Sequence, residues 1–286
     1  MSIANTTQAE AWDTGDSGAH WAANQARYDR MLEPFAAMIL QAAALEPRAR
    51  VLDVGCGCGA TTLAAARLVM PGETVGIDLS GPMLARARAG ADAGGLPNAV
   101  FRQGDAQVYP FEAARFDAVL SRFGVMFFAD PVAAFANVRA ASRPGARLTF
   151  VCWQPRSANQ WLLVPAAAFA EHVPPLDPAA DDGPGMFGLA DPDRLRQILA
   201  AAGWRDIQAT AEHAQLLVGG GGGIDDTVEF IRTGSMGRTM LAQADADTVD
   251  RAVASLRAAL APFADADGVR LGAGVWLVQA VAPART

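Results

Sequence analysis

Short apolar runs alternate with helical patterns through the middle of the chain. In the intervening segments, apolar residues recur every three to four positions, which predicts helices at 61–69, 82–89 and 131–142. The apolar runs are rich in β-forming residues and predict strands at 50–55, 74–79, 99–104, 116–121 and 146–153. Strands that alternate with helices form parallel sheets with right-handed crossovers, so the pattern predicts an α/β fold.

The N-terminal part does not follow this alternation. Residues 20–45 have a helical pattern, in which Pro34 is expected to begin a second helix or to kink the first. Residues 1–18 are polar and are expected to be mobile. We therefore predict an N-terminal helical lid over residues 1–47, followed by one α/β domain over residues 48–286.

The alternation also stops after Trp153. A helix is expected at 159–172, and then a loop rich in Pro, Asp and Gly extends to about residue 190. The five glycines at 219–223 predict a flexible hinge or a turn. The remaining expected elements are a helix capped by Asp191, strands at 207–218 and 269–281, and helices within 224–260. Cap elements are therefore predicted at about 155–190 and 224–242.

Glycines and acids follow three successive strands. Gly55, Gly57 and Gly59 lie directly after the first strand and before a helix, where a ligand can approach bare backbone. On this segment alone, a glycine-rich turn without a ligand remains an alternative. Asp78 ends the second strand and Asp105 follows the third. Because these ends meet at one crevice of a doubly wound sheet, Asp78 is expected to accept from ribose hydroxyls and Asp105 from an adenine amino group.

The segment 48–153 resembles class I S-adenosylmethionine (SAM)-dependent methyltransferases. The similarity lies in the acidic-x-Gly-x-Gly-x-Gly motif at 53–59, Asp78, the loop 104–106 and the Arg-Pro-Gly turn at 143–145. It implies a Rossmann-like, seven-stranded, mainly parallel sheet flanked by helices, with a cap after the fifth strand. It also implies SAM as the cofactor and S-adenosylhomocysteine as its product.

The resemblance also implies a set of cofactor-binding residues. The N-terminal pattern Trp12…Gly18-x-x-Trp21 is similar to relatives of the ubiquinone/menaquinone-biosynthesis methyltransferases, in which an N-terminal helix folds over the cofactor. Tyr28 is the contact expected from that helix. The full implied set is Tyr28, Asp53, Gly55, Gly57, Asp78, Leu79, Met83, Gly104, Asp105, Ala106, Gln107 and Ser121.

Methyl transfer mainly requires alignment and exclusion of water, and it needs a base only when the acceptor carries a proton. The candidate bases are His20, next to Trp21 in the predicted lid, and His172, which could instead compensate the charge at a helix end. Large apolar residues in the irregular segments could form a wall for a small, hydrophobic or aromatic substrate, although each could also be core. The expected substrate residues are Trp21, Met126, Trp153, Trp161, Met186, Phe187, Phe230 and Met236.

The composition narrows the classes of partner. The formal net charge is −7, which disfavours nucleic acid and anionic membrane surfaces. No secretory signal or membrane span is evident, and three cysteines suggest reduced thiols, so a cytoplasmic location is expected. No acidic or His cluster has the grouping of a metal site, so we expect metal independence and a monomer or homodimer.

Two other functions remain open at this point. A nicotinamide-dependent (NAD(P)) oxidoreductase also uses a glycine-rich loop and a ribose acid, although it does not need Asp53. A non-catalytic SAM-binding protein would share the cofactor motifs, and a fold alone does not establish chemistry. We expect methyl transfer to the oxygen, nitrogen or carbon of a metabolite, in cofactor or secondary metabolism.

Overall fold

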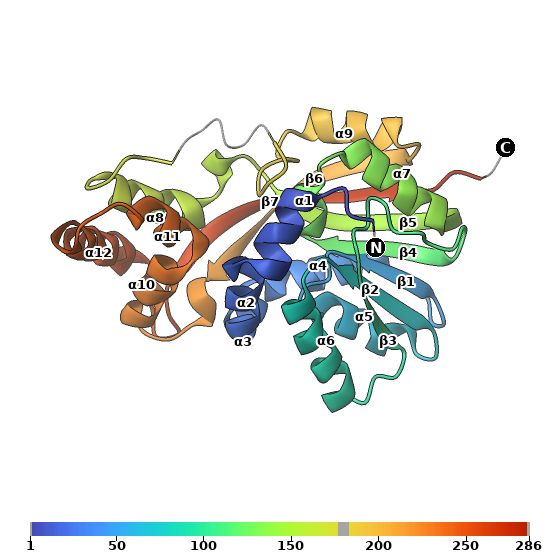
Figure 1. The fold of residues 1–286 in the computed structure, drawn as a ribbon, viewed down its shortest axis with the longest axis horizontal. Helices are drawn as coiled ribbons and strands as arrows, with labels where there is room; N and C mark the ends of the chain where they lie inside the picture. The colour runs from blue at the N-terminus through green and yellow to red at the C-terminus, as the bar shows by residue number, and fades with distance from the viewer. Residues whose placement is uncertain (1, 177–182, 285–286) are drawn as a thin grey trace.

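The computed structural model describes residues 2–176 and 183–284. Seven strands form one sheet in the order β3-β2-β1-β4-β5-β7-β6 (Figure 1). The first five strands run parallel, and β7 is antiparallel to both of its neighbours. The strands are β1 (Arg50–Val54), β2 (Glu73–Asp78), β3 (Ala99–Gln103), β4 (Phe116–Arg122), β5 (Ser142–Trp153), β6 (Arg205–Leu217) and β7 (Arg270–Val281). The predicted seven-stranded, mainly parallel, Rossmann-like sheet is confirmed.

Helices cover both faces of the sheet. One face carries α4 (Glu33–Ala43), α5 (Ala60–Val69) and α6 (Gly81–Ala93), and the other carries α7 (Pro131–Ala141) and α9 (Pro192–Ala201) (Figure 1). Burial on both faces explains why the central strands are continuous apolar runs, with Val51 and Leu52 fully buried. The predicted turn at 143–145 lies within β5, where Gly145 has φ +79° and the register with β4 is interrupted.

A helical layer lies beyond one end of the sheet, where β6 and β7 extend into it (Figure 1). In this layer α12 packs against both α8 and α10, and α10 packs against α11. The four helices are α8 (Gln160–Ala170), α10 (Ile224–Thr233), α11 (Ser235–Leu241) and α12 (Ala246–Leu260). The helices α8, α10 and α11 lie within the ranges predicted for cap elements, whereas α12 follows the second range. Residues 177–182 of the first range lie outside the described residues.

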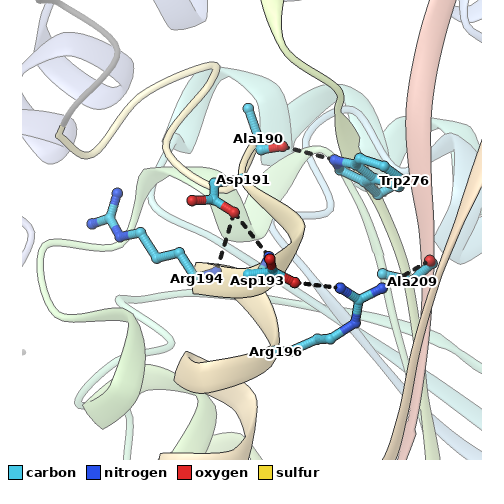
Figure 2. Close-up of polar contacts among 7 residues, drawn as sticks. All are labelled: Ala190, Asp191, Asp193, Arg194, Arg196, Ala209 and Trp276. Atoms are coloured by element: carbon cyan, nitrogen blue, oxygen red, sulfur yellow. Dashed lines mark hydrogen bonds and ion pairs between the residues drawn. The ribbon is translucent and has the colours of Figure 1, made fainter.

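The segment before α9 is fixed to the sheet by polar contacts (Figure 2). Asp191 Oδ1 accepts hydrogen bonds from the backbone N–H groups of Asp193 and Arg194, which confirms the predicted N-cap. The indole N–H of Trp276, on β7, donates to the carbonyl of Ala190 at 2.8 Å. The return of the chain from the cap to the sheet is therefore held at defined positions.

The prediction of a mobile segment at 1–18 is wrong for residues 2–18, and residue 1 lies outside the described residues. The N-terminal part forms α1 (Thr6–Ala9), the π-helix η1 (Glu10–Thr14), α2 (Asp16–Ala23) and α3 (Gln25–Met31). Asp13 Oδ1 accepts from Gly81 N at 2.8 Å and from Gln103 Nε2 at 3.0 Å, which docks this layer onto α6 and β3. A Cβ atom at Gly18 would lie 2.5 Å from Ser80 Oγ, so the close packing of α2 on α6 requires glycine.

The glycine run forms a turn that packs on α3. Residues 219–222 all have positive φ, between +69° and +98°, which favours glycine at each position. The guanidinium of Arg27 donates to the carbonyls of Gly219 and Asp226, each at 2.8 Å. Of the two expected alternatives, the structure shows the turn, and Arg27 ties it to the N-terminal helices.

The loops after β1 and β4 touch at the point where the strand order reverses. A Cβ atom at Gly124, the first residue of η2 (Gly124–Phe127), would lie 2.6 Å from both Gly55 Cα and Val54 O. Ser121 Oγ donates to Val54 O at 2.7 Å and accepts from Gly124 N at 3.2 Å, which links the same two loops. Side chains are thereby excluded from the junction at this crevice.

We expect Gly124→Ala to destabilise the protein, because its methyl group would have to separate two backbones. Overpacking of this kind costs about 1–3 kcal/mol. Thermal unfolding should show a lower Tm for this variant, whereas the control Gly183→Ala, whose Cβ would meet no atom within 4 Å, should unfold like the wild type. Equal Tm values for the two variants would contradict the importance of this contact.

Candidate cofactor and substrate site

One cavity of about 400 Å³ opens at the carboxyl ends of the parallel strands. The loops after β1 to β4 form one part of its lining, and the N-terminal helices and the cap form the rest. Most of the residues predicted for cofactor and substrate line it together. They are His20, Trp21, Tyr28, Asp53, Gly55, Gly57, Asp78, Leu79, Met83, Gly104, Asp105, Ala106, Met126, Trp153, Trp161, Met186, Phe230 and Met236.

Two predicted cofactor residues do not line the cavity. Ser121 is fully buried, and its hydroxyl is used by the two backbone contacts that join the loops after β1 and β4. The Gln107 side chain accepts a hydrogen bond from Asp130 N at 3.0 Å, away from the cavity. Ser121 therefore supports the floor of the cavity, and Gln107 braces the start of α7.

Two further predicted residues, His172 and Phe187, also lie outside the lining. His172 follows α8, where its Nε2 lies 2.9 Å from Ser255 Oγ on α12, so it joins two helices of the cap. Phe187 is buried in the hydrophobic core, with the Arg156 guanidinium 5.6 Å from its ring centroid. The assignment of His172 as a catalytic base is therefore wrong on position, and Phe187 is a core residue.

Asp53 is a buried carboxylate with one unpaired oxygen. It is 1% exposed, and its Oδ2 accepts from Thr62 Oγ1 at 2.5 Å. Its Oδ1 has no hydrogen-bond partner. Burial raises the pKa of Asp53 to about 7, because the charged form is poorly solvated there. An oxygen of this kind suits a cationic or hydrogen-bond donor group that enters the cavity.

Asp78 is held in place while part of its hydrogen-bonding capacity stays free. Its Oδ2 accepts from Gly57 N at 2.7 Å, and its Oδ1 accepts from Ser80 N at 2.9 Å. A carboxylate has about four acceptor positions, so each oxygen retains one. Asp78 can therefore accept from two adjacent hydroxyl groups while it still fixes the glycine loop.

Asp105 is contacted by the N-terminal segment. Its Oδ2 accepts from Ala4 N and Asn5 N, each at 2.8 Å, and its Oδ1 accepts from Asn5 Nδ2 at 2.6 Å and Gln107 N at 3.0 Å. These four hydrogen bonds fill the carboxylate. In this conformation Asp105 has no acceptor position left for an adenine amino group, although it lines the cavity.

Aromatic rings form much of the far wall. Trp21 and Tyr28 stack with a centroid distance of 3.8 Å, and Phe230 lies 5.1 Å from Tyr28. Trp153 lies 4.9 Å from Trp161, both from the part of the chain that follows β4. Tyr28 was expected to contact the cofactor, but it lies in the same ring cluster as Trp21 and Phe230, two of the expected substrate residues.

A small polar group interrupts this apolar wall. His20 lies edge-on to Tyr28 at 6.3 Å, and its buried Nε2 has no partner. Burial, with a smaller contribution from the nearby Arg238, lowers the pKa of His20 below its usual 6.5. Arg238 and Ser235 also line the cavity. The sequence does not indicate these two, because only the large apolar residues of 224–242 suggest a pocket wall there.

The cysteines have no arrangement for chemistry. Cys56, Cys58 and Cys152 are buried free thiols, and burial raises the pKa of each, that of Cys58 to about 12. Over residues 2–176 and 183–284, no three His, Cys, Asp or Glu side chains are grouped as a metal site would require. In the same residues, no helix has the length and apolar character needed to cross a membrane.

Comparison with known proteins identifies the family. Residues 51–145 match the family model described as "Methyltransferase domain". The chain is 32% identical over 204 residues to a nocamycin O-methyltransferase of Saccharothrix syringae, covering 65% of this chain and 72% of that protein. The chain belongs to the class I SAM-dependent methyltransferases. The predicted enzyme class, its SAM cofactor and methyl transfer to a small molecule are confirmed.

Other relatives agree with this family. A demethylmenaquinone methyltransferase of Thermus thermophilus is 32% identical over 163 residues, which cover 54% of this chain and 74% of that protein. Among solved structures, the YcgJ protein of a Bacillus species superposes with a TM-score of 0.58 at 18% identity, covering 88% of this chain and 98% of that one, and so shows the same fold. The relatives do not support the nicotinamide-dependent alternative for this methyltransferase.

The stability of the ligand-free methyltransferase should depend on the charge of Asp53. With its folded pKa near 7 and its unfolded pKa near 4, the folded state keeps a proton that the unfolded state has lost. This contribution to the free energy of unfolding is complete below pH 4 and falls as the pH rises towards 7. We expect Asp53→Asn to reduce the fall in Tm between pH 5 and pH 8; an unchanged pH profile would contradict the buried, raised pKa.

Contact between adenine and Asp105 should require displacement of Asn5. We expect Asn5→Ala to tighten the binding of S-adenosylhomocysteine several-fold, because it removes a side chain that occupies Asp105 Oδ1. Calorimetric titration measures this, with the exposed Thr7→Ala on α1 as the control. Weaker binding by Asn5→Ala would show instead that Asn5 and the cofactor cooperate.

Proposed function

We propose that the cavity holds SAM beside β1 and β2 and a hydrophobic or aromatic metabolite beside the N-terminal helices and the cap. The observation that carries this proposal is the continuity of one cavity between two chemically different walls. One wall has glycines and carboxylates, and the other has stacked aromatic rings. A cofactor and an acceptor bound in one cavity can meet without crossing solvent.

The carboxylate wall fits the cofactor. The unpaired Oδ1 of Asp53 would accept from the methionine ammonium group, and Asp78 would accept from the ribose hydroxyls with its two remaining positions. Gly55 and Gly57 leave room for the methionine and ribose portion. When bound, SAM supplies an activated methyl group on a sulfonium sulfur, so the residues of the chain need only align the acceptor and exclude water.

The aromatic wall fits an acceptor with an apolar body. Trp21, Tyr28 and Phe230 provide flat faces, and His20 adjoins them. Because its pKa is lowered, His20 is mainly uncharged near neutral pH and is able to take a proton from a hydroxyl or amine acceptor. We assign His20 as the base where the acceptor carries such a proton. The transferred methyl group would go to oxygen, nitrogen or carbon accordingly.

The proposal extends to organisation and partners. Residues 1–47 would act as a lid over the cavity, and the elements within 155–190 and 224–242 as a cap that selects the substrate. The net charge of −7 supports a small-molecule partner rather than nucleic acid or an anionic membrane. We place the methyltransferase in the cytoplasm, as a metal-independent monomer or homodimer. The name of the Saccharothrix syringae relative supports a role in secondary metabolism.

Titration with S-adenosylhomocysteine tests the cofactor site. We expect Asp78→Ala to weaken binding by at least about tenfold, because charge-assisted hydrogen bonds contribute about 1.5–3 kcal/mol each. Asp92→Ala, which removes an exposed carboxylate from α6, is the matched control and should bind like the wild type. Folding of each variant is checked by its thermal unfolding. Failure of the folded wild type to bind would reject the proposal.

Transfer of a labelled methyl group tests catalysis separately. Tritiated SAM is incubated with the wild type and a panel of bicyclic phenols, carboxylic acids and amines. Labelled product would separate an enzyme from a non-catalytic SAM-binding protein.

A further inference from the structure

Two arginines line the cavity, and their charges are compensated differently. Arg122 forms an ion pair with Asp29 at 3.3 Å, and its side chain is 11% exposed. The guanidinium of Arg238, on α11, forms no hydrogen bond or ion pair with any residue that the structure describes, and Arg238 is exposed. The second guanidinium therefore brings a solvent-accessible positive charge without a protein partner to the part of the lining that the cap forms.

Arg238 lies near three other hydrogen-bonding side chains, those of Tyr28, His20 and Ser235. Tyr28 and His20 are both close enough to feel its charge. The buried Nε2 of His20 is unpaired, and Ser235 lies one helical turn before Arg238 on the cavity side. The polar group thus combines a fixed positive charge with imidazole, phenol and hydroxyl groups. The acidic residues of the lining, Asp53, Asp78 and Asp105, belong instead to β1 and to the segments at the ends of β2 and β3.

The rest of this end of the cavity is apolar. Trp21, Phe230, Ile231 and Met236 line it next to the polar group. A neutral hydrocarbon would fill this space but would desolvate the guanidinium without pairing it, at a cost in free energy. A ligand with an anionic oxygen would pair it, and a guanidinium matches the geometry of such oxygens well.

We infer that the substrate is an apolar, ring-containing molecule that carries an anionic oxygen, and that Arg238 is the residue that selects it. This inference rests on the proposed function, because it names the class of acceptor for the same cavity. Arg238 pairs with the oxygen while the rings of Trp21, Tyr28 and Phe230 contact the body of the molecule. Specificity for an acid over its neutral analogue follows from the guanidinium that the neutral analogue would leave unpaired.

A matched pair of probes tests the inference. 1-Naphthoate and 1-naphthamide have the same ring system and nearly the same shape, and only the first is anionic. Calorimetric titrations are made on the full chain with saturating S-adenosylhomocysteine. We expect 1-naphthoate to bind at least about tenfold more tightly than 1-naphthamide, as one charge-assisted hydrogen bond would provide.

Two arginine variants locate the origin of this preference. Arg238→Met should weaken 1-naphthoate to the level of 1-naphthamide, with the affinities for 1-naphthamide and S-adenosylhomocysteine unchanged. The control Arg232→Met makes the same change of charge on α10, where Arg232 pairs with Glu229 at 2.7 Å, and it should keep the full preference.

The inference is overturned if the two probes bind with equal affinity or if neither probe binds. It is also overturned if Arg238→Met keeps the preference for 1-naphthoate. Because S-adenosylhomocysteine is titrated first, its failure to bind would reject the proposed function itself, which keeps the two failures distinguishable.

Discussion

The backbones of the loops after β1 and β4 touch at Gly55 and Gly124, and the site depends on this contact. A side chain at either position would separate the two loops, and Ser121 reinforces their contact with two hydrogen bonds. The floor of the cavity is consequently bare backbone, with Asp53 and Asp78 beside it. The N-terminal helices and the cap supply the remaining walls.

The sheet could be predicted from sequence because the residue pattern that indicates each strand lies within that strand and the turn after it. Each strand is recognisable as an apolar run, and a glycine or an acid marks its carboxyl end. Because the strands are parallel, these ends lie at one edge of the sheet, which brings Asp53, Asp78 and Asp105 to the same cavity. The glycines at 55–59 likewise identify the turn before α5. The helix expected at 159–172 is α8, and the helices expected within 224–260 are α10, α11 and α12.

The parts that could not be predicted depend on contacts between distant segments. Asn5 and Asp105 are 100 positions apart, and no local pattern indicates that a polar N-terminal segment will fold onto an acidic loop. The position of His172 depends on α12, which begins more than 70 residues later. Arg238 is an exposed arginine on a short helix, and no local pattern shows that it lines the cavity beside His20 and Tyr28.

The cavity is assembled from two blocks of sequence that can change independently. The lining loops after β1 to β4 lie within residues 51–145, which the family model matches, whereas the N-terminal helices and the cap helices lie outside them. Substitutions in the second block can alter the shape and charge of the acceptor pocket while the first keeps its geometry. Exchange of the cap segments could therefore change the substrate of this methyltransferase while the loops after β1 to β4 stay the same.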